Sequence, residues 1–238
     1  MTREFGSLQD RTAVVTGGAS GIGAATVEQF LTAGANVVIG DMNEEAGQQF
    51  LLELAANGHQ DNVRFQSVDV ADEDQVVQLI NTAVGEFGGL DVLFNNAGIG
   101  GAIGPITELE VEHWDHTFAV MTKGVFLGIK HGAKAMQKGG RGGSIINTAS
   151  IAALSGKGGP LAYSATKAAV VNITMNAAVE LAEYNIRVNA VCPGVIFTEL
   201  MHRGRAAEAE QVIEKIQPST LRGEPEHCLL YTSDAADE

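Results

Sequence analysis

A tyrosine and a lysine stand four residues apart in an alanine-rich stretch. Tyr163 and Lys167 would share one face of a helix, because positions i and i+4 lie one above the other. An ammonium group beside a phenol stabilises the phenolate, so we expect the pKa of Tyr163 to fall towards neutral pH, where a phenol can act as a general acid or base. The alternative is a surface pair on a solvated helix.

A serine precedes this pair and could complete a proton-transfer site. Ser150 stands thirteen residues before Tyr163 and follows a predicted strand. Its hydroxyl could donate a hydrogen bond to a substrate carbonyl oxygen on which negative charge develops. A serine beside a loop can also serve only as a cap.

A glycine-rich segment near the N-terminus is suited to phosphate binding. Gly17, Gly21 and Gly23 lie between a predicted strand and a predicted helix, and Ser20 and Ile22 lie among them. Glycines permit a sharp turn and a close backbone approach to a pyrophosphate, whose charge would lie at the helix N-terminus. The position between strand and helix favours nucleotide binding over a simple turn.

An aspartate could select the nucleotide. Asp41 ends the next predicted strand, eighteen residues after Gly23. An acid about 20 residues beyond the glycines can accept hydrogen bonds from ribose hydroxyls and would repel a 2′-phosphate, which favours NAD over NADP. The alternative is a loop or capping acid, because Asn43 and two glutamates follow.

The elements that must position these residues alternate between strand and helix. Short apolar runs predict strands at 12–16, 36–41, 63–68, 90–94, 144–148 and 186–191. Amphipathic stretches predict helices at 22–33, 44–57, 72–87, 111–136 and 162–183, with a short polar helix at 205–216. Such alternation is typical of βαβ units and of a parallel sheet covered on both faces. We therefore expect a single doubly wound α/β domain.

In this order, the motifs resemble those of the classical short-chain dehydrogenase/reductase family. The resemblance extends from Thr12 to about Thr198 and rests on Thr16–Gly23, Asp69-Val70, Asn95-Asn96-Ala97-Gly98, Ser150, Tyr163-x-x-x-Lys167 and Pro193-Gly194. It implies a Rossmann-like fold and an NAD(P)-dependent oxidoreductase that acts on CH–OH groups. It also implies that a chain with a complete C-terminus would form a homo-oligomer, a dimer or tetramer, through the two long helices.

The resemblance further implies which residues contact the cofactor. Asp69 and Val70 would flank the adenine, Asn95 would contact the ribose region and Thr198 would hydrogen-bond the nicotinamide carboxamide. The other implied contacts are Gly17, Ser20, Gly21, Ile22, Gly23, Asp41, Ala97, Gly98, Tyr163, Lys167, Pro193, Gly194 and Ile196. Asn95 and Asn96 could instead stabilise the turn after their strand.

One residue departs from the family pattern inside the site. Met121 stands where the family often carries an asparagine, which is thought to hold a water that links the lysine to solvent. A thioether accepts hydrogen bonds only weakly and cannot donate them. We expect an altered proton path, with the hydroxyl of Thr122 as one alternative route.

The C-terminus departs further. Residues 228–238 match the translation of a transposase-type sequencing adapter, so we expect a non-native tail after an incomplete Rossmann-like domain at 1–227. The expected domain lacks its last strand, which would leave 186–191 as an exposed edge. An unusual natural tail is the alternative.

The composition of the chain excludes several classes of binding partner. The formal net charge of −14 repels phosphate backbones and anionic lipids, so we expect neither nucleic acid nor membrane as a partner. Two cysteines and no apolar run of about 18 residues favour a cytoplasmic protein. His113 and His116 could pair on a helix face, but without a third ligand nearby we expect them to be solvated and no metal to bind.

The most favoured function is an NAD(H)-dependent oxidoreductase that interconverts a secondary alcohol and a ketone, with Ser150, Tyr163 and Lys167 as catalytic residues. A non-catalytic nucleotide-binding or scaffold protein that retains the fold is the alternative. Pocket walls at 98–106, 152–160 and 195–211 are rich in Gly, Ala and Leu and favour a largely apolar small-molecule substrate.

Overall fold

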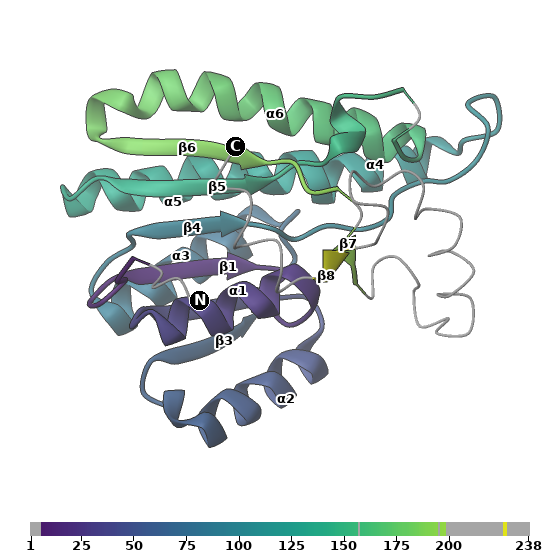
Figure 1. Ribbon diagram of the computed structural model, residues 1–238. Helices are drawn as coiled ribbons and strands as arrows, with labels where there is room; N and C mark the ends of the chain where they lie inside the picture. The colour runs from purple at the N-terminus through teal and green to yellow at the C-terminus, as the bar shows by residue number, and fades with distance from the viewer. Residues whose placement is uncertain (1–5, 157, 195, 199–225, 228–238) are drawn as a thin grey trace.

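A six-stranded parallel sheet forms the centre of the molecule (Figure 1). The structure is a computed structural model, and it describes residues 6–156, 158–194, 196–198 and 226–227. The strands lie in the order β3-β2-β1-β4-β5-β6, with bounds β1 Thr12–Thr16, β2 Asn36–Asp41, β3 Val63–Ser67, β4 Val92–Asn95, β5 Gly143–Thr148 and β6 Ile186–Val191. The predicted single doubly wound α/β domain is confirmed.

Helices cover both faces of the sheet. α1 (Gly21–Thr32) and α2 (Glu44–Leu54) pack on one face, and α3 (Glu73–Phe87), α5 (Gly124–Gly139) and α6 (Leu161–Leu181) pack on the other (Figure 1). β1 shows why both faces are needed, since its apolar residues alternate between two cores. Ala13 and Val15 join the core beneath α1, whereas Val14 joins the core beneath α3.

The long helix predicted at 111–136 is interrupted. α4 (Val111–Phe118) runs into the π-helical turn η2 (Ala119–Lys123), and α5 follows directly. At its end, the backbone N–H of Gly124 donates to the carbonyl oxygen of Ala119. Such turns occur frequently at functional sites, and Met121 lies in the middle of this one.

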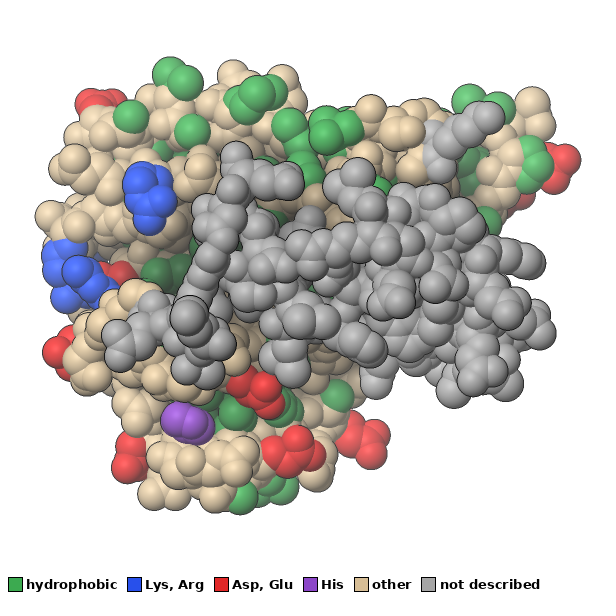
Figure 2. Space-filling view, viewed as in Figure 1, with side chains coloured by type: hydrophobic (Ala, Val, Ile, Leu, Met, Phe, Trp, Pro, Cys, Tyr) green, Lys and Arg blue, Asp and Glu red, His purple; other side chains and the backbone are tan. Residues whose placement is uncertain are grey.

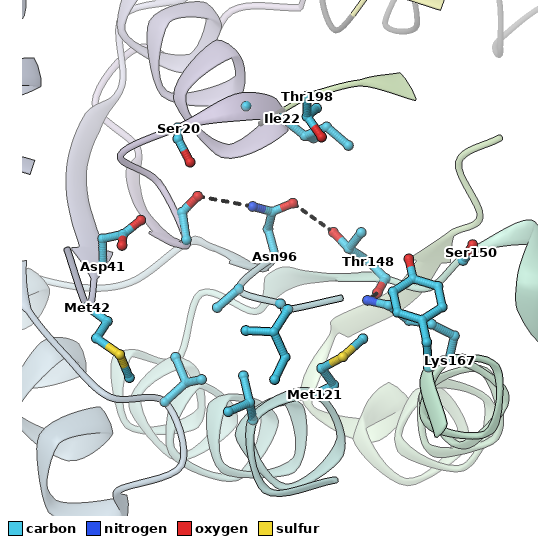
Figure 3. A pocket seen from close by; sticks show the side chains of 18 of the residues that line it. Ser20, Ile22, Asp41, Met42, Asn96, Met121, Thr148, Ser150, Lys167 and Thr198 are labelled. Carbon is cyan, nitrogen blue, oxygen red and sulfur yellow. Dashed lines mark hydrogen bonds between the residues drawn. The ribbon is translucent and has the colours of Figure 1, made fainter. Parts of the chain in front are cut away.

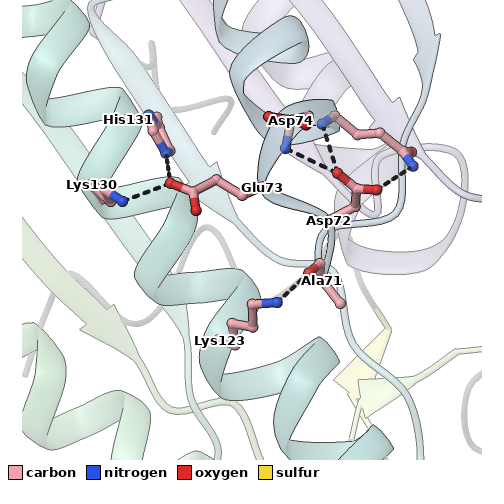
Figure 4. A network of polar contacts seen from close by, with 8 residues as sticks. Ala71, Asp72, Glu73, Asp74, Lys123, Lys130 and His131 are labelled. Atoms are coloured by element: carbon pink, nitrogen blue, oxygen red, sulfur yellow. Dashed lines mark hydrogen bonds and ion pairs between the residues drawn. The ribbon is translucent and has the colours of Figure 1, made fainter.

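Polar groups fix the start of α3 against α5 (Figure 4). Asp72 caps α3 by accepting from the backbone N–H groups of Asp74 and Gln75. The Glu73 carboxylate accepts from Lys130 Nζ at 2.6 Å and contacts His131 Nε2 at 2.9 Å. These two side-chain partners lower the pKa of Glu73 to about 2.

The remaining elements are short. They are η1 (Ala55–His59), η3 (Ile151–Ala153), η4 (Ala182–Tyr184), β7 (Ile196–Phe197) and β8 (Glu226–His227). β7 and β8 pair in parallel outside the main sheet, and β6 pairs only with β5 among the described strands, so it forms the sheet edge. The helix predicted at 205–216 and the tail at 228–238 lie outside the described residues. No helix in the described ranges is long and apolar enough to cross a membrane.

Candidate active site

A cavity of about 610 Å³ opens at the carboxyl ends of the strands. Its wall takes residues from the segments that follow all six strands of the main sheet. Doubly wound folds bind their ligands in this crevice, and the volume is ordinary for a small-molecule site. Figure 3 shows Ser20 and Asp41 at one end, Ser150 and Lys167 at the other, and Asn96 and Thr148 between them.

All but two of the residues predicted for the site line this cavity. They are Gly17, Ser20, Gly21, Ile22, Asp41, Asp69, Val70, Ala97, Gly98, Ser150, Tyr163, Lys167, Pro193, Gly194, Ile196 and Thr198. Gly23 and Asn95 are not on the wall. Gly23 is buried, and a Cβ there would overlap the carbonyl oxygen of Gly17, so this glycine lets α1 pack directly on the loop.

The glycine-rich loop has the backbone that its sequence predicts. Gly17 and Gly21 adopt φ of +61° and +53°, in the left-handed region that favours glycine. A Cβ on Gly17 would lie 2.8 Å from Ala97 Cα. Ser20 is the N-cap of α1, yet its side chain makes no capping hydrogen bond, so the first N–H groups of the helix stay available to an anion.

Asp41 lies at the end of β2 with its carboxylate on the cavity wall (Figure 3). One carboxylate oxygen accepts from the Ala19 backbone N–H at 3.0 Å and the other from the Asn43 N–H at 3.0 Å. The cap of α2 is Asn43 itself, which accepts from Ala46 N–H. Asp41 therefore ties the glycine-rich loop to β2 and still presents a carboxylate to the cavity.

The structure places Asn95 off the cavity wall. Its side chain is buried, lies against Gly128 of α5 and donates to Asn147 Oδ1 at 2.9 Å. Its neighbour Asn96 lines the cavity instead. Asn96 donates to the carbonyl oxygens of Thr16 and Gly17 and accepts from the Thr148 hydroxyl, so it joins the ends of three strands (Figure 3).

Lys167 and Tyr163 share one face of α6, as their spacing predicts. The Lys167 side chain is only 4% exposed, and its ammonium donates to the carbonyl oxygen of Thr148 at 2.6 Å. The same nitrogen lies 5.6 Å from the centre of the Tyr163 ring. The surface-pair alternative therefore fails, because both side chains line the cavity, with Lys167 buried and Tyr163 half-buried.

Ser150 faces this pair from the end of β5. It is the N-cap of η3, and its Oγ accepts from the Ala152 backbone N–H at 3.1 Å. Its side chain also hydrogen-bonds Tyr163. Ser150 thus both caps η3 and lies beside the phenol.

The pKa of the phenol runs against the direction expected from the Tyr-Lys spacing. Burial raises the pKa of Tyr163, and the hydrogen bond from Ser150 only partly opposes this. Burial also lowers the pKa of Lys167 to about 8, with Cys192 acting in the opposite direction. The Lys167 ammonium lies over the Tyr163 ring and donates its hydrogen bond to the Thr148 carbonyl oxygen.

Sequence reasoning missed several wall residues. They are Gly40, Met42, Asn43, Val68, His116, Val120, Thr148 and Ala149. Asn96, Ile99 and Met121, which also line the cavity, lie in motifs or segments that the sequence had already singled out. His116 is exposed on α4 and reaches the wall, and His113 is exposed as well. Within the described part of the chain, no three His, Cys, Asp or Glu side chains gather as metal ligands.

Comparison with known proteins gives a consistent result. The family model for short chain dehydrogenase matches residues 11–209. A 3beta-hydroxysteroid dehydrogenase 2 of Eggerthella lenta is 42% identical over 187 residues, which cover 79% of this chain and 71% of the relative. A cis-4-hydroxycyclohexanecarboxylate dehydrogenase of Sinomonas cyclohexanicum is 42% identical over 234 residues, which cover 97% of this chain and 92% of the relative.

A solved structure shares the architecture. The crystal structure of a short-chain type dehydrogenase/reductase from Mycobacterium marinum superposes with a TM-score of 0.87 and 32% identity, over 95% of this chain and 87% of that chain. This chain therefore belongs to the short-chain dehydrogenase family of NAD(P)-dependent oxidoreductases.

Proposed function

We propose that this protein interconverts a secondary alcohol and a ketone with NAD(H), using Ser150, Tyr163 and Lys167. The observation that carries the proposal is that these side chains converge on one wall of the cavity whose other end holds the glycine-rich loop and Asp41. A proton-transfer group and a candidate dinucleotide cradle thus share one space.

The chain's own residues would handle the oxygen and its proton. In oxidation, the Tyr163 phenolate accepts the hydroxyl proton while the carbonyl forms, and in reduction the phenol returns it. Ser150 donates a hydrogen bond to the same oxygen and holds it beside the phenol. Lys167, when protonated, favours the phenolate. The nicotinamide ring, when bound, supplies the hydride acceptor or donor.

The residues present fit a dinucleotide, and the oxidised and reduced forms of NAD fit better than those of NADP. The uncapped start of α1 and the left-handed glycines suit a pyrophosphate. Asp41 would accept from ribose hydroxyls and repel a 2′-phosphate. Among the described wall residues that follow β2, Met42 and Asn43 bring no cation that could neutralise such a phosphate.

The proposed substrate class is an alicyclic secondary alcohol or the matching ketone. The two relatives named above act, by their names, on a hydroxysteroid and on a hydroxycyclohexanecarboxylate. The loops beside the cavity carry exposed apolar side chains at Ile103, Ile106 and Leu154, which suits a ring with few polar groups. The segments at 199–211 that we expect to complete this wall lie outside the described residues.

We also propose self-association through α5 and α6. Phe126 on α5 and Met175 and Val179 on α6 are 50%, 55% and 81% exposed. Hydrophobic side chains gather over α6 on the face shown in Figure 2. A mass above that of the 24.9 kDa monomer in light scattering would support this, and a monomer would contradict it.

A binding-and-turnover comparison tests the proposed function. Protein fluorescence quenching measures NADH binding, and absorbance measures NADH formation from NAD with a panel of alicyclic and linear secondary alcohols. We expect binding together with turnover of at least one alicyclic alcohol. If the protein binds NADH tightly but neither oxidises any alcohol nor reduces any ketone, the nucleotide-binding scaffold would instead be favoured.

A further inference from the structure

Met121 is fully buried in a cluster that contacts Tyr163, one member of the proposed catalytic pair. It is 0% exposed and forms a small apolar cluster with Val70 and Val120, against which Tyr163 packs. In Figure 3 its side chain rises from the helix beneath the cavity, between the region of Asn96 and the turn of α6 that carries Lys167. The thioether therefore packs in the apolar cluster that the Tyr163 ring contacts.

The sulfur contacts the turn of α6 that holds the pair. Thr166 Oγ1 lies 3.8 Å from Met121 Sδ, and the same hydroxyl donates to the Tyr163 carbonyl oxygen at 2.7 Å. A thioether offers no donor and only a weak acceptor. Met121 thus brings bulk to this turn without a polar group that could hold a water there.

The Lys167 ammonium is poor in polar partners. Of its three donors, the described residues satisfy one, through the Thr148 carbonyl oxygen. The ionisable groups that face it are Tyr163 from its own helix and Cys192 from the segment after β6, and no carboxylate in the described residues forms an ion pair with it. The stability of the charged form of a buried ammonium with so few partners depends on how much water reaches it.

We propose that Met121 is a positioning residue that keeps water away from the Tyr163–Lys167 pair. The inference deepens the proposed function and rests on it. Its consequence is that the apolar side chain at position 121, and not Lys167 alone, sets the pH at which the phenol ionises. Burial already acts in this direction on both groups, since it raises the pKa of Tyr163 and lowers that of Lys167.

A polar residue at position 121 should reverse this effect. Water or an amide beside Lys167 favours its charged form, and the charged lysine and the added solvation both favour the phenolate. Met121→Asn should therefore lower the pKa of Tyr163. Met121→Leu keeps the site apolar at nearly the same volume and serves as the matched control. Met121→Ser gives a second polar variant of smaller volume.

The direct test is a titration of the tyrosines in the cofactor-free protein. The chain has only three, so carbon-13 labelling of the phenol ring gives few NMR signals, and Tyr163→Phe identifies the one from Tyr163. We expect this signal to titrate about one pH unit lower, or more, in Met121→Asn and Met121→Ser than in the parent chain. Met121→Leu should titrate within experimental error of the parent.

The pH profile of kcat for alcohol oxidation provides the second readout. Its acidic limb should move to lower pH in Met121→Asn by the same amount as the NMR titration. An unchanged Tyr163 titration in both polar variants, or an equal shift in Met121→Leu, would overturn the inference. Failure of the proposed function has a different signature: the parent chain would turn over no alcohol, whatever the titration of Tyr163.

Discussion

Two lysines on neighbouring helices show how differently this fold treats the same side chain. Lys130 on α5 is 35% exposed, pairs with Glu73 at 2.6 Å and lies near the Phe126 ring. Lys167 on α6 is 4% exposed and has a carbonyl oxygen as its hydrogen-bond acceptor. The first is a solvated surface ion pair (Figure 4), and the second is a buried cation at a cavity wall (Figure 3).

The difference is in line with the proposed role of Lys167. An exposed ion pair adds little to stability, because water already solvates both charges. A buried ammonium without a carboxylate costs free energy, so its presence needs a compensating use. In this chain the buried ammonium of Lys167 lies at the carboxyl ends of the strands, beside the Tyr163 phenol, which could exchange protons.

The largest effect should come from replacing each lysine with methionine. We expect Lys167→Met to lower kcat/KM for the best alcohol by at least about 10²-fold, whereas Lys130→Met leaves it unchanged. Because a buried charge is removed, Lys167→Met should keep or raise the thermal midpoint. Steady-state kinetics and calorimetry measure both. Equal activity of the two variants would contradict the contrast.

Ser150→Ala should have the next largest effect. Loss of the hydroxyl removes a hydrogen bond to the reacting oxygen, and we expect kcat to fall roughly 10²- to 10³-fold. The lost cap on Ala152 should cost about 1 kcal/mol of unfolding free energy. Ser150→Thr keeps a hydroxyl and serves as the control. Wild-type kcat in Ser150→Ala would leave only the capping role.

Asp41→Asn should change cofactor choice rather than chemistry. A charge-assisted hydrogen bond contributes about 1.5–3 kcal/mol, so we expect the preference for NAD over NADP in kcat/KM to fall roughly ten- to hundredfold. The kcat with saturating NAD should stay close to that of the parent. An unchanged preference would assign Asp41 only to holding the Ala19 and Asn43 N–H groups.

Glu73→Gln on the surface should have the smallest effect. The pKa of Glu73 is lowered, so the stabilisation by its charged form is complete above the ordinary pKa of 4.5 and is lost as the pH falls towards about 2. We expect a slightly lower thermal midpoint for the variant at pH 7 and convergence with the parent near pH 2. A constant difference across this range would point to packing instead of charge.

The sequence predicted the fold well because strong local patterns agree with it. β1, β2 and β6 have the predicted bounds, since each is a short apolar run between turn residues. The π-helical turn at Ala119–Lys123 was missed, because helical periodicity does not reveal one inserted residue. No local sequence motif marks this turn, and η2 instead makes tertiary contacts with α6.

The sequence predicted which residues line the site better than it predicted their pKa shifts. Short motifs indicated which residues meet at the strand ends, because parallel strands end at one edge of the sheet. They could not tell Asn95 from Asn96, since adjacent strand residues point to opposite sides and the register decides which faces the cavity. The direction of the Tyr163 pKa was wrong because burial depends on Met121 and other residues distant in sequence.

The most direct test of the account is Tyr163→Phe, which removes one oxygen atom from the site. NADH formation from an alcohol that the parent chain oxidises should fall at least about 10²-fold, while NADH binding measured by fluorescence stays unchanged. Turnover by Tyr163→Phe at the parent rate would contradict the account, because the proton would then leave the alcohol by another route.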